Sequence, residues 1–245
     1  MTEVVRCCWE SFSLTDTGRV RKHNEDAFLN RDDIGHWVVA DGMGGHDAGD
    51  VASQMVVDTL VKIEIGDDLP RFVDRVEDGL LDVNSTLRAL AGSDDRIIGT
   101  TVAGLAFFEN HFFMYWCGDS RIYLYRHGRL IQQTVDHTYA QQLVEEGKIS
   151  AQDVKNHPEG NIITRAVGAG NNLYIDMDLR PLLAGDLFLV CSDGLDKELD
   201  DSEIADFLAN SDLSLEARVR AMMDEALRRA GRDNTTIILA QVSAE

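Results

Sequence analysis

Apolar and polar residues repeat along this chain with two different periods. Short apolar runs such as 36–40 and 111–117 are rich in β-branched and aromatic residues, which is typical of strands. Two longer segments, 47–63 and 70–90, instead show the spacing of amphipathic helices. In the second of these, the apolar positions that fall on one face are Phe72, Val73, Val76, Leu80, Leu81 and Val83. The pattern therefore predicts both kinds of element.

Strands and helices are grouped in blocks along the sequence. We expect strands at 27–29 and 36–40, the second ending in a glycine-rich turn at 41–45, and then the two helices. The later elements are a meander over 100–126, a helix near 138–147, strands near 173–180 and 186–191, helices near 201–210 and 214–230, and a last strand at 235–242. Such blocks indicate an α+β fold with mainly antiparallel sheets.

No repeat and no linker divides the chain, so we expect a single domain over 1–245. Within it, the polar and irregular stretch at 136–170 is longer than an ordinary connection between elements. We expect this stretch to be a functional flap that shapes substrate choice, although a mobile surface loop would have a similar sequence.

Charge excludes two classes of partner. With 23 basic and 43 acidic residues, the net charge is −20, so nucleic acid and anionic membranes should be repelled. Cys7 and Cys8 are adjacent, and Cys117 and Cys191 lie in apolar runs, so there is no disulfide framework. Neither a leader peptide nor 18 consecutive apolar residues is present, and we expect a cytoplasmic protein.

Aspartates recur where expected strands meet polar or glycine-containing turns: Asp26, Asp41, Asp119, Asp193 and Asp233. A single aspartate in such a place is usually a turn or cap residue. Asp41 and Asp193, however, lead directly into glycine, which leaves carbonyl oxygens beside the carboxylate, and hard cations prefer such oxygens. If these ends converge, their charges would raise one another's pKa, and bound Mg²⁺ or Mn²⁺ would relieve the repulsion.

Seven segments, taken in order, resemble the motifs of the metal-dependent protein phosphatase family, also called type 2C, in its bacterial form. They are 15–26, 41–46, 99–101, 118–121, 157–168, 192–195 and 231–234. The resemblance spans nearly the whole chain. It implies a sandwich of two mainly antiparallel β-sheets flanked by α-helices, in four layers ordered αββα, with the metals at one end of the sandwich.

The resemblance also implies a set of metal-binding residues for two Mn²⁺ or Mg²⁺ ions. Asp41 would lie between the two ions, Asp193 and Asp233 would bind the first, and the carbonyl of Gly42 would bind the second.

Three further acids complete the implied set. Asp26, with Glu25 near it, would hold water molecules bound to the metals. Asp119 would help to hold a third, weaker ion that is seen in bacterial members of the family.

Arg21 matches the arginine that binds the substrate phosphate in the family, and its planar guanidinium can meet two phosphoryl oxygens at once. Eukaryotic members carry a histidine directly after Asp-Gly to protonate the leaving group, whereas this chain has Met43 there. We expect His46, three residues later, or water to serve instead. The expected catalytic residues are Arg21, Asp41, Asp193 and His46.

The implied activity is hydrolysis of phosphoserine and phosphothreonine in proteins, by a hydroxide that bridges two metals and attacks phosphorus in line with the leaving oxygen. Such an enzyme would oppose a serine/threonine kinase in bacterial signalling, and we expect a monomer. One alternative is a non-catalytic relative that binds phosphoproteins, but no expected aspartate is missing. The other is a phosphatase of small metabolites, which the sequence does not exclude.

Overall fold

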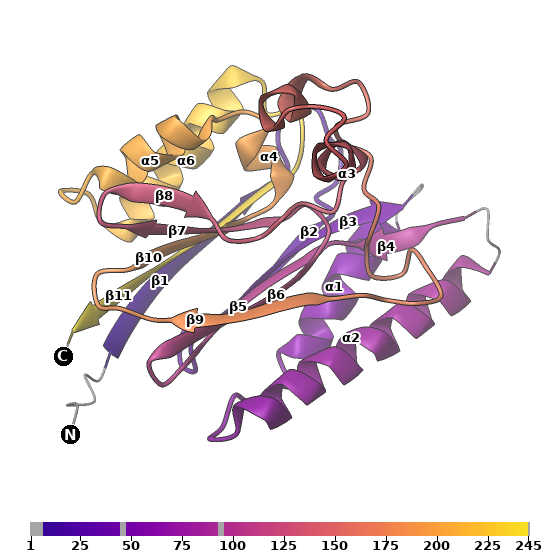
Figure 1. Cartoon of the computed structure of the whole chain (residues 1–245), viewed down its shortest axis with the longest axis horizontal. Coiled ribbons are helices and arrows are strands. Elements are labelled where there is room, and N and C mark those ends of the chain that lie inside the picture. The colour runs from indigo at the N-terminus through magenta and orange to yellow at the C-terminus, as the bar shows by residue number, and fades with distance from the viewer. Residues whose placement is uncertain (1–6, 45–47, 93–95, 245) are drawn as a thin grey trace.

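Two β-sheets pack face to face between two layers of helices (Figure 1). The computed structural model describes residues 7–44, 48–92 and 96–244. The first sheet has the order β1 (Cys7–Asp16), β11 (Thr235–Ala244), β10 (Leu187–Cys191), β7 (Arg121–Arg126) and β8 (Arg129–Gln132). It joins strands from the beginning, the middle and the end of the chain.

The second sheet comes mainly from the first half of the chain. Its order is β2 (Asp26–Arg31), β3 (His36–Gly44), β5 (Val102–Phe108), β6 (His111–Cys117) and β9 (Asp176–Pro181), and the short β4 (Ile98–Thr100) pairs with β3. Among the described residues, all strand pairings in both sheets are antiparallel. The α+β sandwich expected from the sequence is confirmed.

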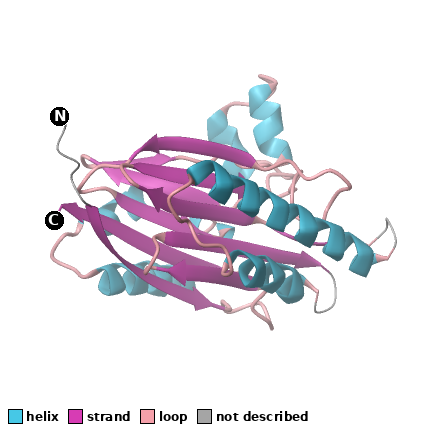
Figure 2. Cartoon of the chain, turned by 90° about the horizontal axis from the view of Figure 1, so that it is seen from below, coloured by secondary structure: helices cyan, strands magenta, loops and turns pink. Residues whose placement is uncertain are grey.

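Helices cover the outer face of each sheet. Those on the second sheet are α1 (Gly49–Leu60) and α2 (Leu69–Ala91), which Figure 2 shows in front of the strands. Those on the first sheet are α4 (Asp193–Asp196), α5 (Asp201–Ala209) and α6 (Leu215–Arg229), while α3 (Tyr139–Glu145) and the 3₁₀ helix η1 (Ala151–Asn156) lie in the segment 136–170. No helix of the described chain has the length and apolar character needed to cross a membrane.

Helix α2 shows how local sequence sets an element. The Asp68 side chain caps its start by accepting a hydrogen bond from the Arg71 backbone N–H at 3.2 Å. Gly92 ends it in the left-handed region, with φ of 72°. Its buried face is formed by Phe72, Val76, Leu80, Val83, Asn84, Leu87 and Ala91. Of the positions expected on this face, Val73 is only partly buried and the expectation is wrong for Leu81, which is exposed.

The core between the two sheets is built on aromatic contacts. Phe107 of β5 packs against Trp37 of β3, with ring centroids 4.8 Å apart, and against Phe188 of β10 at 5.3 Å. Phe112 of β6 packs on the same Phe188 ring at 4.7 Å. These rings fix the spacing of the sheets and so the positions of the strand ends.

The prediction of a glycine-rich turn at 41–45 is wrong for residues 41–44, because strand β3 continues to Gly44. Residue 45 lies outside the described residues. Residues 98–100 form β4 and pair with it, Gly42 opposite Thr100 and Gly44 opposite Ile98. The local sequence favours a turn, but a partner strand more than 50 residues away supplies the hydrogen bonds. Likewise the helix expected at 47–63 ends at Leu60, and β9 begins at Asp176 rather than near 173.

Segment 136–170 is held to the sandwich at both ends. Near its start, the His137 N–H donates to the Gly118 carbonyl at 2.9 Å. Near its end, Val167 forms a β-bridge with Thr100, and inside the segment Thr138 is bridged to Ile163. These contacts bring the segment beside the turn that carries Asp119.

Candidate functional site

Asp26 links the two sheets at one end of the sandwich. It lies directly opposite Asp41 in the pairing of β2 with β3. Its Oδ2 accepts hydrogen bonds at 2.7 Å from the hydroxyl groups of Ser192 and Thr236, which belong to the ends of the first sheet. The strand ends therefore converge. The sequence pattern had left open whether they do.

Burial of Asp26 raises its pKa to about 7, although the two hydroxyl donors oppose the shift, and the charges of Asp193 and Asp233 add to it. Its second oxygen, Oδ1, is buried without a hydrogen-bond partner among the described residues. Ser192 Oγ also accepts from the Thr236 N–H at 2.9 Å. Ser192 thus positions Asp26.

The backbone of Asp41 is fixed by the two threonines of the 99–101 motif. The Asp41 N–H donates to Thr101 Oγ1 at 3.0 Å, and the Asp41 carbonyl accepts from the Thr101 N–H at 2.8 Å and from Thr100 Oγ1 at 3.0 Å. Its carboxylate forms no hydrogen bond with the described residues. Desolvation, followed by the charges of Asp26 and Asp193, raises the pKa of Asp41 well above its usual value.

Lys197 contacts two of the expected metal ligands. It follows the short helix α4 directly, four residues after Asp193, and forms ion pairs with Asp193 and, at 3.1 Å, with Asp233. Burial raises the pKa of Asp193 despite this ammonium group. Burial would also raise the pKa of Asp233, but the charges of Lys197 and Arg21 outweigh it and hold that pKa below its usual value.

Arg21 lies at the edge of the site, with half of its side chain exposed. Its Nε is 2.8 Å from Asp233 Oδ1, and its Nη2 is 3.0 Å from Asp233 Oδ2. The guanidinium group expected to bind phosphate is therefore paired with a carboxylate in this structure. The pairing places it within reach of the aspartates and keeps its charge at the mouth of the site.

Glu25 and Gly42 lie where the start of α1 approaches β3. The Gly42 N–H donates to the Glu25 carbonyl at 3.0 Å. A Cβ at Gly42 would lie 2.0 Å from the Gly49 carbonyl oxygen, and a Cβ at Gly49 would lie 2.5 Å from Glu25 Oε1, so neither position accepts a larger residue without rearrangement. Burial raises the pKa of Glu25.

Asp119 sits in the turn that passes from β6 in the second sheet to β7 in the first. Gly118 precedes it with φ of 118°, and the Gly118 N–H donates to His137 Nδ1 at 3.1 Å. Asp119 Oδ1 is buried without a partner among the described residues. Burial, followed by the charge of Asp193, raises the pKa of Asp119 well above its usual value.

A group of charged residues beside the site was not singled out from the sequence. Arg121 pairs with Asp136 at 2.6 Å and with Asp196 at 2.9 Å, and His137 Nε2 lies 3.1 Å from Asp176. The spacing of four residues between Asp193 and Lys197 could have indicated their ion pair if a helix had been expected there. The sequence did not predict the helix α4. His46, an expected catalytic residue, lies outside the described residues.

The acids fit divalent cations by their chemistry. With the side chains in their present positions, no group of three His, Cys, Asp or Glu residues within the described ranges is arranged to hold a metal ion. The ammonium of Lys197 instead bridges Asp193 and Asp233. Buried oxygens of Asp26, Asp119 and Asp193 nevertheless lack partners, and an all-oxygen set suits Mg²⁺ or Mn²⁺.

Comparisons of the sequence and of the structure with known proteins lead to the same family. The family model described as "Protein phosphatase 2C" matches residues 18–234. The serine/threonine phosphatase stp of Listeria welshimeri is 35% identical over 236 residues, which are 93% of each chain. PppA, described as a key regulatory component of T6SS in Pseudomonas aeruginosa, has a structure with a TM-score of 0.88, 40% identity, and coverage of 97% of this chain and 100% of that chain.

A further solved structure is that of the catalytic domain of the serine/threonine protein phosphatase PstP in complex with two manganese ions. It is similar to this chain with a TM-score of 0.85 and 31% identity, covering 97% of this chain and all of that one. The chain spans 44% of the full-length PstP of Mycobacterium tuberculosis.

Proposed function

This chain belongs to the protein phosphatase 2C family, and on that premise we propose that it hydrolyses phosphoserine and phosphothreonine in proteins with divalent cations held by its aspartates. The observation that carries the proposal is the cluster of buried carboxylates with raised pKa and unpartnered oxygens. Such a cluster is unfavourable unless positive charge enters it.

Two cations are proposed, with residues in the roles that the motifs suggest. Asp41 would contact both ions, Asp193 and Asp233 the first, and the Gly42 carbonyl the second. Either Mn²⁺ or Mg²⁺ suits these oxygens. When bound, the two cations supply a nucleophile at neutral pH by lowering the pKa of water, and they neutralise charge on the phosphoryl group.

The outer acids complete the proposed site. Asp26, held by Ser192 and Thr236, and Glu25 would orient water molecules around the cations. Asp119, on the turn that His137 supports, would help to hold a third, weaker ion.

Arg21 binds the substrate phosphate in this proposal. Its fork now meets Asp233, and an ion on Asp233 would compete for that carboxylate and release the guanidinium. The released fork can then accept two phosphoryl oxygens in the same bidentate way. His46 is our candidate for protonating the leaving oxygen, with water as the other source of that proton.

We also propose the setting of the reaction. Residues 1–245 would form one catalytic domain, with 136–170 as a flap that contacts the substrate beside the aspartates. The protein would act as a monomer in the cytoplasm and reverse the action of a serine/threonine kinase on its targets. Its charge of −20 disfavours nucleic acid as a partner.

The test uses the purified chain with a phosphothreonine peptide and Mn²⁺. We expect phosphate release that EDTA abolishes and that added Mn²⁺ restores, with Asp193→Asn inactive but folded. A sugar phosphate at equal concentration serves as the comparison for a metabolite phosphatase. Faster release from the sugar phosphate, or release that EDTA leaves unchanged, would contradict the proposal.

A further inference from the structure

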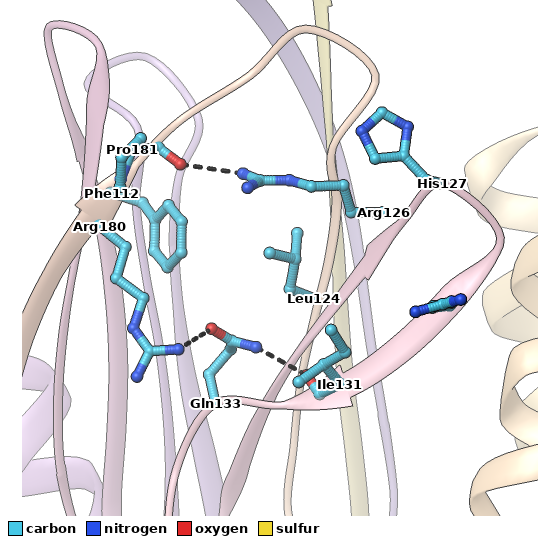
Figure 3. A pocket seen from close by; sticks show the side chains of 9 residues that line it. Phe112, Leu124, Arg126, His127, Ile131, Gln133, Arg180 and Pro181 are labelled. Atoms are coloured by element: carbon cyan, nitrogen blue, oxygen red, sulfur yellow. Dashed lines mark hydrogen bonds between the residues drawn. The ribbon is translucent and has the colours of Figure 1, made fainter.

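A cavity of about 590 Å³ opens at the side of the sandwich, between the edge strands β8 and β9 (Figure 3). Strand β7 runs from the aspartate cluster towards it. Its first residue, Arg121, pairs with acids near Asp193, and its last residue, Arg126, lines the cavity. Five steps of about 3.3 Å along the strand separate these ends by roughly 17 Å. We call this the side cavity, and it is distinct from the proposed metal site.

The floor of the side cavity is apolar. Phe112 of β6 and Leu124 of β7 belong to the core between the two sheets, so the cavity continues that core to the surface. Ile131 of β8 and Pro181 at the end of β9 complete the apolar lining, and Ile131 is 50% exposed. An apolar group placed here would be removed from water on several sides.

Two arginines cross the mouth of the side cavity from one sheet to the other. Arg126 Nη2 donates to the Pro181 carbonyl at 2.9 Å, and Arg180 Nη1 donates to Gln133 Oε1 at 2.8 Å. Figure 3 shows these two bonds at opposite ends of the cavity. They limit the opening along the strand direction, which favours a compact ligand over an extended peptide lying along β8 or β9.

Positive charge at the rim exceeds the negative charge. Arg126 is paired with the buried Asp186 at 2.6 Å and Arg180 with Asp178 at 2.7 Å. Arg129 pairs with Arg126 through the β-ladder, but its side chain has no hydrogen bond or ion pair with the described residues. The two N–H groups on Arg126 Nη1 have no partner among these residues either. In a chain of net charge −20, this is a local site for an anion.

We propose that the side cavity binds a small organic anion, with an aliphatic or aromatic body on the apolar floor and a carboxylate or other anionic group on Arg126 and Arg129. The volume lies within the range of about 300–1,000 Å³ that is usual for small-molecule sites. Charge-assisted hydrogen bonds from guanidinium groups would fix the anionic end. The floor would select a ligand that carries an apolar body.

The probe for this proposal is 2-naphthoate, titrated into the metal-loaded full chain and followed by amide chemical shifts and calorimetry. We expect saturable shifts confined to amides of β7, β8 and β9. The neutral 2-naphthylmethanol should bind about tenfold more weakly, the loss expected for one charge-assisted contact. Ile131→Trp should fill the cavity and abolish binding.

Charge reversal gives the matched comparison. Arg129→Glu changes an exposed, unpaired arginine and should weaken naphthoate binding about tenfold. Arg71→Glu makes the same change at an exposed arginine of α2, whose side chain has no partner in the described chain, and should leave binding unchanged. Thermal unfolding of each variant verifies that it is folded.

Several results would overturn the proposal. These are equal binding of the neutral analogue, equal effects of Arg129→Glu and Arg71→Glu, or shifts centred on the aspartate cluster. Tighter binding of a decaglutamate peptide than of naphthoate at β7, β8 and β9 would assign the surface to an acidic peptide and overturn the small-ligand assignment.

Discussion

Lys197 is a direct probe of whether cations enter the aspartate cluster. Its ammonium pairs with Asp193 and Asp233, and these three side chains are 28%, 12% and 19% exposed. Hydrogen bonds between charged groups contribute about 1.5–3 kcal/mol each, and partial exposure reduces that value. Replacing Lys197 by methionine should therefore cost the metal-free protein about 3 kcal/mol in free energy of unfolding.

In a chain of this size, 1 kcal/mol shifts the melting temperature by about 2–4 °C. We therefore expect Lys197→Met to lower the melting temperature by about 6–12 °C in EDTA. With saturating Mn²⁺ the ion replaces the ammonium, and the decrease should be less than about 2 °C. The thermodynamic cycle that links unfolding and Mn²⁺ binding then requires the variant to bind Mn²⁺ more tightly than the unchanged protein, by at most roughly 100-fold.

Thermal unfolding with and without Mn²⁺, together with calorimetric titration of Mn²⁺, measures both quantities. Lys148→Met is the control, because Lys148 is 63% exposed and its ion pair within the described part of the chain is with the exposed Glu146. The control should shift the melting temperature by less than about 1 °C in either condition. Equal destabilisation of Lys197→Met in EDTA and in Mn²⁺, or weaker Mn²⁺ binding, would refute the reasoning.

Three further predictions concern named residues. Asp41→Asn should lower kcat by at least about a hundredfold, because it removes charge that the cations require, while the metal-free protein keeps its melting temperature or gains stability from reduced repulsion; a large loss of stability would point to a structural role instead. Arg21→Ala should reduce kcat/KM for a phosphopeptide while calorimetry still detects Mn²⁺ binding, since its charge serves phosphate rather than metal. His36 is buried with Nε2 2.8 Å from the Tyr115 hydroxyl, and burial lowers its pKa from 6.5 to about 3. The unfolded chain therefore takes up a proton below pH 6.5 that the folded protein excludes, and stability present above that pH falls by about 2 kcal/mol by pH 5. Urea unfolding should show a smaller decrease between pH 7 and pH 5 in His36→Gln, and an equal decrease would contradict this assignment.

The sequence predicted the type and order of most elements, because local periodicity carries that information. Most of the buried face of α2 and the aspartates beside strand ends were visible without tertiary information, although Leu81, expected on that face, is exposed. Strand β8 and helix α4 were not predicted, since four residues carry too little pattern to decide between strand, helix and turn. Strand β1 was not specified either, because it is defined by its pairing with β11 at the other end of the chain.

Within the site, the sequence determined which acids are available, and only the tertiary structure decided their surroundings. The register that places Asp26 opposite Asp41, and the hydroxyl groups of Ser192 and Thr236 that reach Asp26 from the other sheet, depend on pairings between distant segments. The position of Lys197 between Asp193 and Asp233 has the same origin. Electrostatic interactions and desolvation depend on distance and burial in space, so a linear pattern of charges does not specify them.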